Sequence, residues 1–182
     1  MTEPAPPQFL TVGHTTHPLE EFIQMLHSVQ VELVVDVRRL PGSNRYPQFN
    51  QDALAVSLPE QSIAYRRAEA LGGRRGRDPD VPPEVNGFWH NRSFHHYADY
   101  TLSQPFRTGL DELIEWGTRQ RAVVMCSEAV WWRCHRRIIA DHLLARGHPV
   151  LHLMGVDRAM PAELTPGAVV DPDDGQVTYP AQ

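Results

Sequence analysis

Both cysteines of the chain lie in one short segment together with a carboxylate, a histidine and three arginines. The segment runs from Cys126 to Arg137, after an apolar run typical of a buried strand and before an apolar stretch with helical spacing. Thiol, imidazole, carboxylate and guanidinium groups are what enzymes use as nucleophiles, acids, bases and anion ligands. This crowding on a strand-to-helix connection indicates a reactive or anion-binding site more than a packing element.

Cys134 is the stronger candidate for a nucleophile in this segment. We expect a helix from Arg133 to Arg146, which would place Cys134 in its first turn among basic side chains. A helix dipole and neighbouring cations both favour the thiolate form of a cysteine. Cys126 ends an apolar strand, where a cysteine is more often a small buried hydrophobic side chain. The alternative for either cysteine is a packing role alone.

The beginning of the same helix predicts an anion-binding site. Free backbone N–H groups at a helix start, with arginines beside them, hold phosphate or carboxylate. Arg133, His135 and Arg136 would supply the side chains. The alternative is that these side chains pair with nearby carboxylates in a structural network.

Two familiar phosphate-binding patterns are missing from this segment. A P-loop needs glycines and a lysine, which the segment lacks. The phosphatase pattern of cysteine, five residues and arginine would place the arginine where Trp132 stands, and Arg133 comes one place too late. The sequence therefore predicts an anion site of another kind.

Composition favours one soluble domain. A chain of 182 residues is long enough for one substantial core and too short for two. No stretch reaches the roughly 20 apolar residues of a membrane helix, and residues 1–8 do not resemble a secretory signal. We therefore expect a cytoplasmic protein, no membrane partner, and cysteines present as thiols.

The basic residues are all arginines, and their distribution leaves a second function open. The net charge of -5 argues against general attraction to nucleic acid. The stretch Arg38–Arg77, however, holds eight arginines against Asp52, Glu60 and Glu69. A nucleic-acid-associated binding protein that uses this stretch without catalysis is therefore the alternative to an enzyme.

Hydrophobic patterns predict an α/β fold with a mostly parallel sheet of about five strands and helices on both faces. The expected strands are Phe9–Gly13, Leu33–Val37, Ser62–Arg66, Ala122–Cys126 and Val150–Leu153. We expect one core domain at 9–155, a disordered extension at 1–8, and an irregular acidic tail at 156–182. A small hairpin around Asp173, Asp174 and Gly175 is expected inside that tail.

Polar residues at the ends of three predicted strands would converge on one edge of the sheet. His14 follows the first strand, and Asp36 and Arg38 end the second. Cys126 and Glu128 end the fourth. Ligands bind at this edge of parallel sheets, so these groups would share a crevice if the three strands are neighbours.

The carboxylates and the histidine at this edge are candidates for acid–base catalysis. Asp36, Glu128 and His14 could run a hydrolysis in which one group activates water and another protonates the leaving group. Alternatively, Asp36 and Arg38 form an ion pair that orders the long loop after them, and His14 hydrogen-bonds a turn. The candidate catalytic residues are thus His14, Asp36, Glu128 and Cys134, and the candidate anion-binding residues are Arg38, Arg133, His135 and Arg136.

A series of motifs resembles a known family. In order, they are Gly13-His14-Thr15-Thr16, Asp36-Val37-Arg38, Pro47-Gln48-Phe49-Asn50, Leu71-Gly72-Gly73, Tyr97-Ala98-Asp99-Tyr100, Cys126-x-Glu128 and Cys134-His135-Arg136. From about Phe9 to Leu153 the chain resembles the bacterial and archaeal family called domain of unknown function 488. That family usually has Gly-His-Ser-Thr in the first motif, so Thr15 is a departure that keeps a hydroxyl. The resemblance implies a compact α/β fold and no particular activity.

The sequence thus leaves two hypotheses. The first is a hydrolase or transferase that acts on a nucleotide-like or other anionic small molecule at the sheet edge. The second is the nucleic-acid-binding protein described above. No cofactor is expected; zinc is only an alternative, because no Cys-x-x-Cys or His-Glu-x-x-His spacing accompanies the candidate ligands. Those ligands would be His14, His17, Asp36, Cys126, Cys134 and His135.

Overall fold

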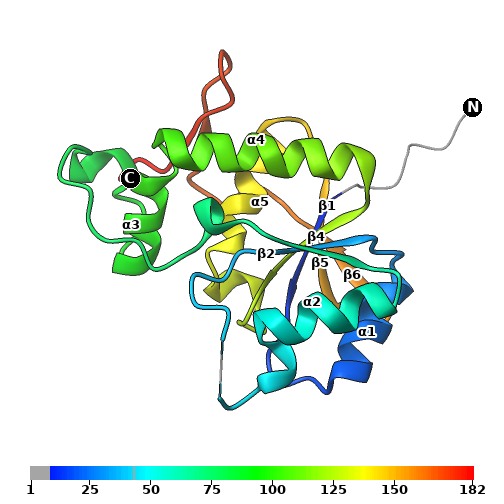
Figure 1. The fold of residues 1–182 in the computed structure, drawn as a ribbon. Helices are drawn as coiled ribbons and strands as arrows, with labels where there is room; N and C mark the ends of the chain where they lie inside the picture. Colours follow the sequence, from blue (N-terminus) through cyan, green and yellow to red (C-terminus); the bar gives the residue numbers. More distant parts are fainter. Residues whose placement is uncertain (1–8, 43) are drawn as a thin grey trace, which may run out of the picture.

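The computed structural model describes residues 9–42 and 44–182, and its centre is a six-stranded sheet in the order β3-β2-β4-β1-β5-β6 (Figure 1). The first five strands in the chain run parallel, and the last is antiparallel to β5. The strands are β1 (Phe9–Gly13), β2 (Leu33–Asp36), β3 (Ala64–Arg67), β4 (Ala122–Cys126), β5 (Val150–Gly155) and β6 (Arg158–Pro161). The prediction of a mostly parallel α/β sheet is confirmed, with one strand more than expected.

Helices cover both faces of this sheet, as Figure 1 shows. The helices are α1 (Leu19–Ser28), α2 (Gln51–Glu60), α3 (Arg92–Tyr100), α4 (Gln104–Arg119) and α5 (Arg136–Ala145). Four single-turn 3-10 helices connect them: η1 (Pro47–Phe49), η2 (Glu69–Leu71), η3 (Pro83–Asn86) and η4 (Trp131–Arg133). The strands β1, β2 and β4 are buried on both faces, which explains why their sequences are nearly continuous apolar runs.

Each face of the sheet has its own apolar core. Side chains of α1 and α2, such as Phe22 and Leu54, pack with Leu10 and Val34 on one face. The other face packs α4 and α5 against alternate residues of the same strands. This alternation follows from the two-residue period of a strand and fixes which strand residues face which layer.

The helix after the cysteines begins later than the sequence predicts. The expected start was Arg133, but α5 begins at Arg136. Residues Trp131–Arg133 form the separate turn η4, and Cys134 after it is extended, with φ -125° and ψ 147°. Cys134 therefore lies outside the helix, in the connection between η4 and α5.

The C-terminal tail is built into the fold. It supplies β6 and a hairpin of β7 (Val169–Val170) and β8 (Val177–Thr178), which brackets the expected turn at 173–175. Tyr179 is fully buried, and its hydroxyl donates to Asp141 Oδ2 at 2.7 Å. The chain end lies beside α3, near the backbone of η3 (Figure 1). The predicted extension at 1–8 lies outside the described residues.

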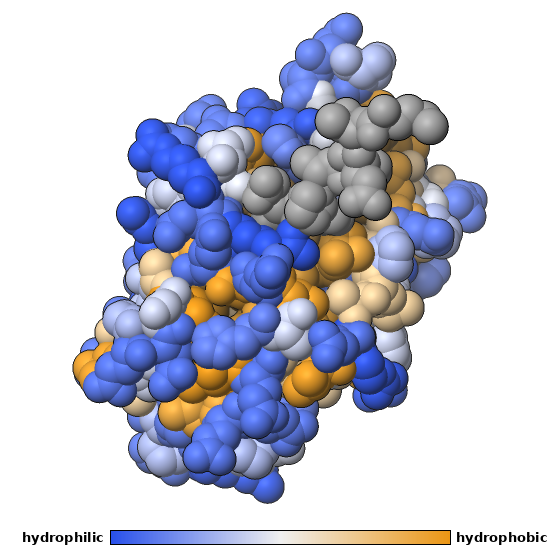
Figure 2. Space-filling model, turned by 90° about the vertical axis from the view of Figure 1, so that its right-hand side faces the viewer, coloured by the Kyte–Doolittle hydropathy of each residue, from blue (hydrophilic) through white to orange (hydrophobic). Residues whose placement is uncertain are grey.

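The side of the molecule in Figure 2 has a mixed surface. Hydrophilic residues cover most of it, and apolar residues show between them. In the described part of the chain, no helix is both long enough and apolar enough to span a membrane.

Candidate active site at the carboxyl edge of the sheet

Three neighbouring strands bring the predicted residues to one edge of the sheet. In the order β2-β4-β1, Gly13 lies opposite Cys126, and Asp36 lies opposite Met125. The ladder continues past the strand ends, since His14 N–H donates to Cys126 O at 2.9 Å. The three strands are therefore neighbours, as the predicted shared crevice requires.

The polar edge opens into a cleft of about 830 Å³. Cys126, Cys134 and His135 lie in its wall together with His14. Among the described residues that line the cleft, the charged side chains are Arg38, Arg39, Arg74, Arg133 and Glu128. The cleft therefore has a surplus of positive charge in an acidic protein, which suits an anionic ligand.

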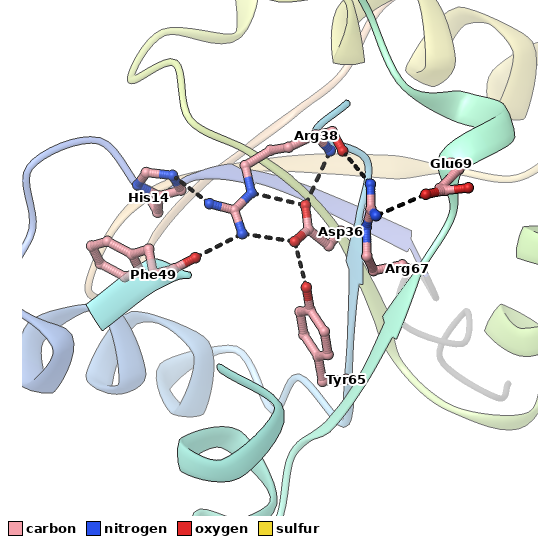
Figure 3. Close-up of polar contacts among 7 residues, drawn as sticks. All are labelled: His14, Asp36, Arg38, Phe49, Tyr65, Arg67 and Glu69. Atoms are coloured by element: carbon pink, nitrogen blue, oxygen red, sulfur yellow. Dashed lines mark hydrogen bonds and ion pairs between the residues drawn. The ribbon is translucent and has the colours of Figure 1, made fainter. Parts of the chain in front are cut away.

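Arg38 is held by a buried network (Figure 3). Its Nε and Nη2 donate to the two carboxylate oxygens of Asp36 at 2.9 and 2.7 Å, and Nη2 also donates to Phe49 O at 2.7 Å. Tyr65 donates its hydroxyl to Asp36 Oδ2 at 2.5 Å. Most of the guanidinium donors are thus used inside the protein, and the side chain presents only its remaining edge to the cleft.

Asp36 is fully buried and is not among the residues that line the cleft. Its oxygens accept hydrogen bonds from the Arg38 guanidinium, the Arg38 backbone N–H and the Tyr65 hydroxyl. This geometry is the ion pair considered as an alternative above, and it orders the loop after β2. Direct acid–base work by Asp36, as predicted, would require the network to open.

His14 is placed as a neutral side chain. Its Nδ1 donates to Thr15 O at 3.0 Å, which leaves Nε2 to accept from Arg38 Nη1 at 3.2 Å, and its ring stacks on Phe49. Burial, together with the charge of Arg38, lowers the pKa of His14 to about 4. Both ring nitrogens are used, so His14 is suited to orienting Arg38.

The two cysteines lie side by side in the wall of the cleft. Both are free and buried, and the Cys134 thiol donates to Cys126 Sγ at 2.8 Å. Arg136 Nη1 donates to the same Cys126 sulfur at 2.7 Å. The Cys126 sulfur therefore receives both the Arg136 guanidinium and the thiol hydrogen bond.

These contacts act in opposite directions on the two thiols. Burial opposes ionisation of Cys126, but the hydrogen bond from Cys134 and the charge of Arg136 outweigh it and lower the pKa to about 7. Burial, and then the hydrogen bond and charge of Cys126, raise the pKa of Cys134 well above its ordinary value. These contacts favour ionisation of Cys126 over ionisation of Cys134, whereas the sequence favoured Cys134.

Arg136 is a supporting residue in this arrangement. It is fully buried and does not line the cleft. Besides Cys126, its guanidinium donates to Glu128 O at 2.6 Å and to Ala129 O at 3.3 Å. It therefore fixes the loop after β4 and places a positive charge beside the Cys126 thiol, on the side away from the cleft.

Glu128 and Arg133 are exposed and line the cleft, so they are free to meet a ligand. His135 also lines the cleft, and its Nδ1 lies 3.6 Å from Cys134 Sγ. Burial lowers the pKa of His135 to about 4, so it offers a neutral ring to a ligand. Of the predicted anion-binding residues, Arg133 has the geometry for charge pairing with an anion.

The segment of residues 70–74 also contributes to the cleft wall, since Gly73 and Arg74 line it. The hydroxyls of Tyr97 and Tyr100 on α3 donate to Leu71 O at 2.7 Å and to Ala70 O at 2.6 Å. At Gly73, a Cβ atom would lie 2.8 Å from the His135 Nδ1 atom. The motifs Leu71-Gly72-Gly73 and Tyr97-Ala98-Asp99-Tyr100 thus place this segment, and Arg74 after it, beside His135.

Several cleft residues were missed as site residues by sequence reasoning. The sequence places Cys126 at the sheet edge but favours a packing role for its thiol, and it gives Arg39 and Arg74 no role beyond membership of the arginine-rich stretch. The resemblance contained one usable signal, since it included the motif Leu71-Gly72-Gly73 directly before Arg74. Among the described residues, no group of three or more histidine, cysteine or acidic side chains is placed to hold a metal ion.

The fold and the cleft define a class: an α/β protein with a thiol-bearing, arginine-lined cleft at the carboxyl edge of a parallel sheet. Residues 18–143 match the model of the family described as Domain of unknown function DUF488, and the chain belongs to that family. No curated protein and no solved structure matches the chain.

Proposed function

We propose that this protein is an enzyme that binds an anionic small molecule in the cleft and uses Cys126 as its nucleophile. The observation that carries the proposal is the meeting of an activated thiol with four cleft arginines and a single carboxylate. A ligand with a phosphate or carboxylate group matches guanidinium donors in charge and geometry. A nucleotide-like molecule is one such ligand, and hydrolysis or group transfer is the reaction class.

Each cleft residue has a role in this proposal. Arg39, Arg74 and Arg133 pair with the anionic group, and Arg38 supports them with the edge that its network leaves free. The Cys126 thiolate attacks the electrophilic atom of the substrate and forms a covalent bond as the leaving group departs. Glu128, which is exposed at the cleft, is the group placed to accept a proton from the water or acceptor that releases the product.

Binding of simple anions tests the arginine-lined cleft. Titration calorimetry with pyrophosphate and adenosine monophosphate should detect binding, and uncharged adenosine should not bind. Arg39→Ala and Arg133→Ala should each weaken binding by about two- to five-fold, since an exposed charge pair contributes up to about 1 kcal/mol. Arg119→Ala is the matched control, because Arg119 is an exposed arginine on α4 that pairs with Glu115. Absence of anion binding, or equal weakening by the control, would contradict the proposal.

The nucleic-acid alternative has less support from the contacts of the arginine-rich stretch. Arg66 stacks on Trp116 with 4.9 Å from its Cζ to the ring centroid, and Arg75 stacks on Tyr100 at 4.0 Å. Arg67 pairs with Glu69. These arginines are used within the fold, so the stretch does not present one continuous basic surface. DNA binding that falls steeply with added salt and survives Cys126→Ser would favour the alternative.

A further inference from the structure

The thiol pair is built from two segments that the fold brings into contact. Cys126 ends β4, and Cys134 follows η4 after the loop of residues 127–133. The two sulfur atoms lie 2.8 Å apart, and a disulfide bond requires about 2.05 Å. Both residues are free cysteines, so a small movement within this loop would join them.

The two sulfurs are in different surroundings. Cys126 Sγ accepts a hydrogen bond from the Arg136 guanidinium. Cys134 Sγ accepts one from the Arg136 backbone N–H instead, at 3.4 Å. A thiol that is readily ionised attacks first in thiol–disulfide exchange, and a protonated neighbour is kept for the second step. The opposite shifts of the two thiol pKa values described above fit this division of work.

Cys126 and Cys134 both belong to the wall of the cleft, although each is largely buried. A disulfide that entered the cleft would meet Cys126 while any acidic groups it carries lie among the arginines. The cleft volume of about 830 Å³ is large enough for a small peptide-like molecule.

We propose that Cys126 and Cys134 form a dithiol–disulfide couple that reduces small-molecule disulfides in the cleft. This inference goes beyond the proposed function, on which it rests for the use of Cys126 as nucleophile: the electrophilic atom is sulfur, and Cys134 takes the place of water or another acceptor in the second step. For repeated turnover, an external thiol must reduce the Cys126–Cys134 disulfide back to the dithiol.

The reaction balances in two steps. The Cys126 thiolate attacks one sulfur of the substrate disulfide; the S–S bond breaks, and the departing thiolate takes a proton from solvent. Cys134 then loses its proton and attacks Cys126 Sγ in the mixed disulfide, which releases the second substrate thiolate, and that thiolate is protonated in turn. The substrate gains two electrons and two protons, and the protein is left with a Cys126–Cys134 disulfide.

The test is to treat the fully reduced full-length chain with oxidised glutathione, which carries carboxylates, and separately with uncharged bis(2-hydroxyethyl) disulfide. Mass spectrometry of acid-quenched samples should show the loss of two hydrogen atoms and a peptide that links Cys126 to Cys134. In Cys134→Ser a glutathione adduct should accumulate on Cys126, and Cys126→Ser should form no adduct on Cys134 at a comparable rate. Circular dichroism of both variants checks that they are folded, and the wild-type result stands without them.

The outcomes separate this inference from the proposed function. Wild-type protein that forms no Cys126–Cys134 disulfide, or a first adduct on Cys134, overturns the dithiol couple even if the cleft binds anions. We expect oxidised glutathione to react about ten-fold faster or more than the uncharged disulfide, because the arginines attract its carboxylates. Equal rates with rapid disulfide formation would support the couple and overturn the anion-binding function.

Discussion

Cys126 and Cys134 illustrate what a sequence conveys about single residues. The sequence places both thiols at the right junction, but it favours Cys134 on the basis of a helix dipole. The helix begins two residues after Cys134, and the Arg136 side chain turns back to Cys126. Which thiol an arginine contacts depends on the path of the backbone between them, and residue spacing does not contain that information.

Asp36 offers a prediction at the residue scale. Asp36→Asn should lower the free energy of unfolding by about 3 to 5 kcal/mol, because it leaves the buried Arg38 guanidinium without its counter-charge. Urea denaturation at neutral pH measures this loss. Glu69→Gln is the control, since Glu69 is exposed in its pair with Arg67 and should matter by less than about 1 kcal/mol. A loss in Asp36→Asn as small as that in Glu69→Gln would show that the buried contacts of Asp36 in Figure 3 do not hold the β2 edge together.

At the scale of elements, the order of the strands decides whether a site exists. Hydrophobic patterns predict strands β1, β2 and β4 well, because each is buried on both faces and therefore strongly apolar. Their adjacency, which brings His14, Asp36 and Cys126 to one edge, comes from pairing between distant segments. The placement of η2, and of Gly73 after it beside His135, also depends on hydrogen bonds from α3, which lies further along the chain.

Gly13 tests how tightly β1 meets the loop after β4. An added Cβ at Gly13 would lie only 1.7 Å from Glu128 O, a backbone atom held by Arg136. Gly13→Ala should therefore lower the free energy of unfolding by about 3 kcal/mol and displace the thiol loop. Gly42→Ala is the matched control, because among the described residues, its chain neighbours aside, nothing lies within 4 Å of its added Cβ. Thermal unfolding compares the two, and a Gly13→Ala protein as stable as the control would contradict this close approach.

At the scale of the whole molecule, the sequence predicts the core domain better than its end. An acidic, proline-containing tail suggested an irregular segment, yet it adds β6 to the sheet and buries Tyr179. Tertiary contacts, such as the hydrogen bond between Tyr179 and Asp141, stabilise a segment whose local pattern is weak. Short strands that depend on such contacts carry little periodic signal of their own.

Buried neutral histidines should make the stability of the whole protein depend on pH. Burial lowers the pKa of His14, His135 and His152 to about 4 and that of His142 to about 3. Below pH 6.5 the unfolded chain binds protons that the folded protein does not, so stability falls as the pH drops toward 4. Each histidine should cost about 1 kcal/mol at pH 5.5.

Urea denaturation at several pH values measures this dependence. His142→Leu removes a buried ring whose Nε2 has no hydrogen-bond partner among the described residues, and it should flatten the fall in stability between pH 6.5 and 4.5. His90→Gln, at an exposed position, is the control variant. Parallel slopes for all three proteins would mean that His142 is protonated in the folded state.

The central claim is that Cys126 is the reactive thiolate of the cleft, and its alkylation by iodoacetamide as a function of pH tests this most directly. Mass spectrometry of peptides from the folded wild-type protein reports the modification of each cysteine separately. We predict that Cys126 is modified first, with a half-maximal rate near pH 7, where its pKa lies. A half-maximal rate near pH 9, or faster modification of Cys134, would contradict the account.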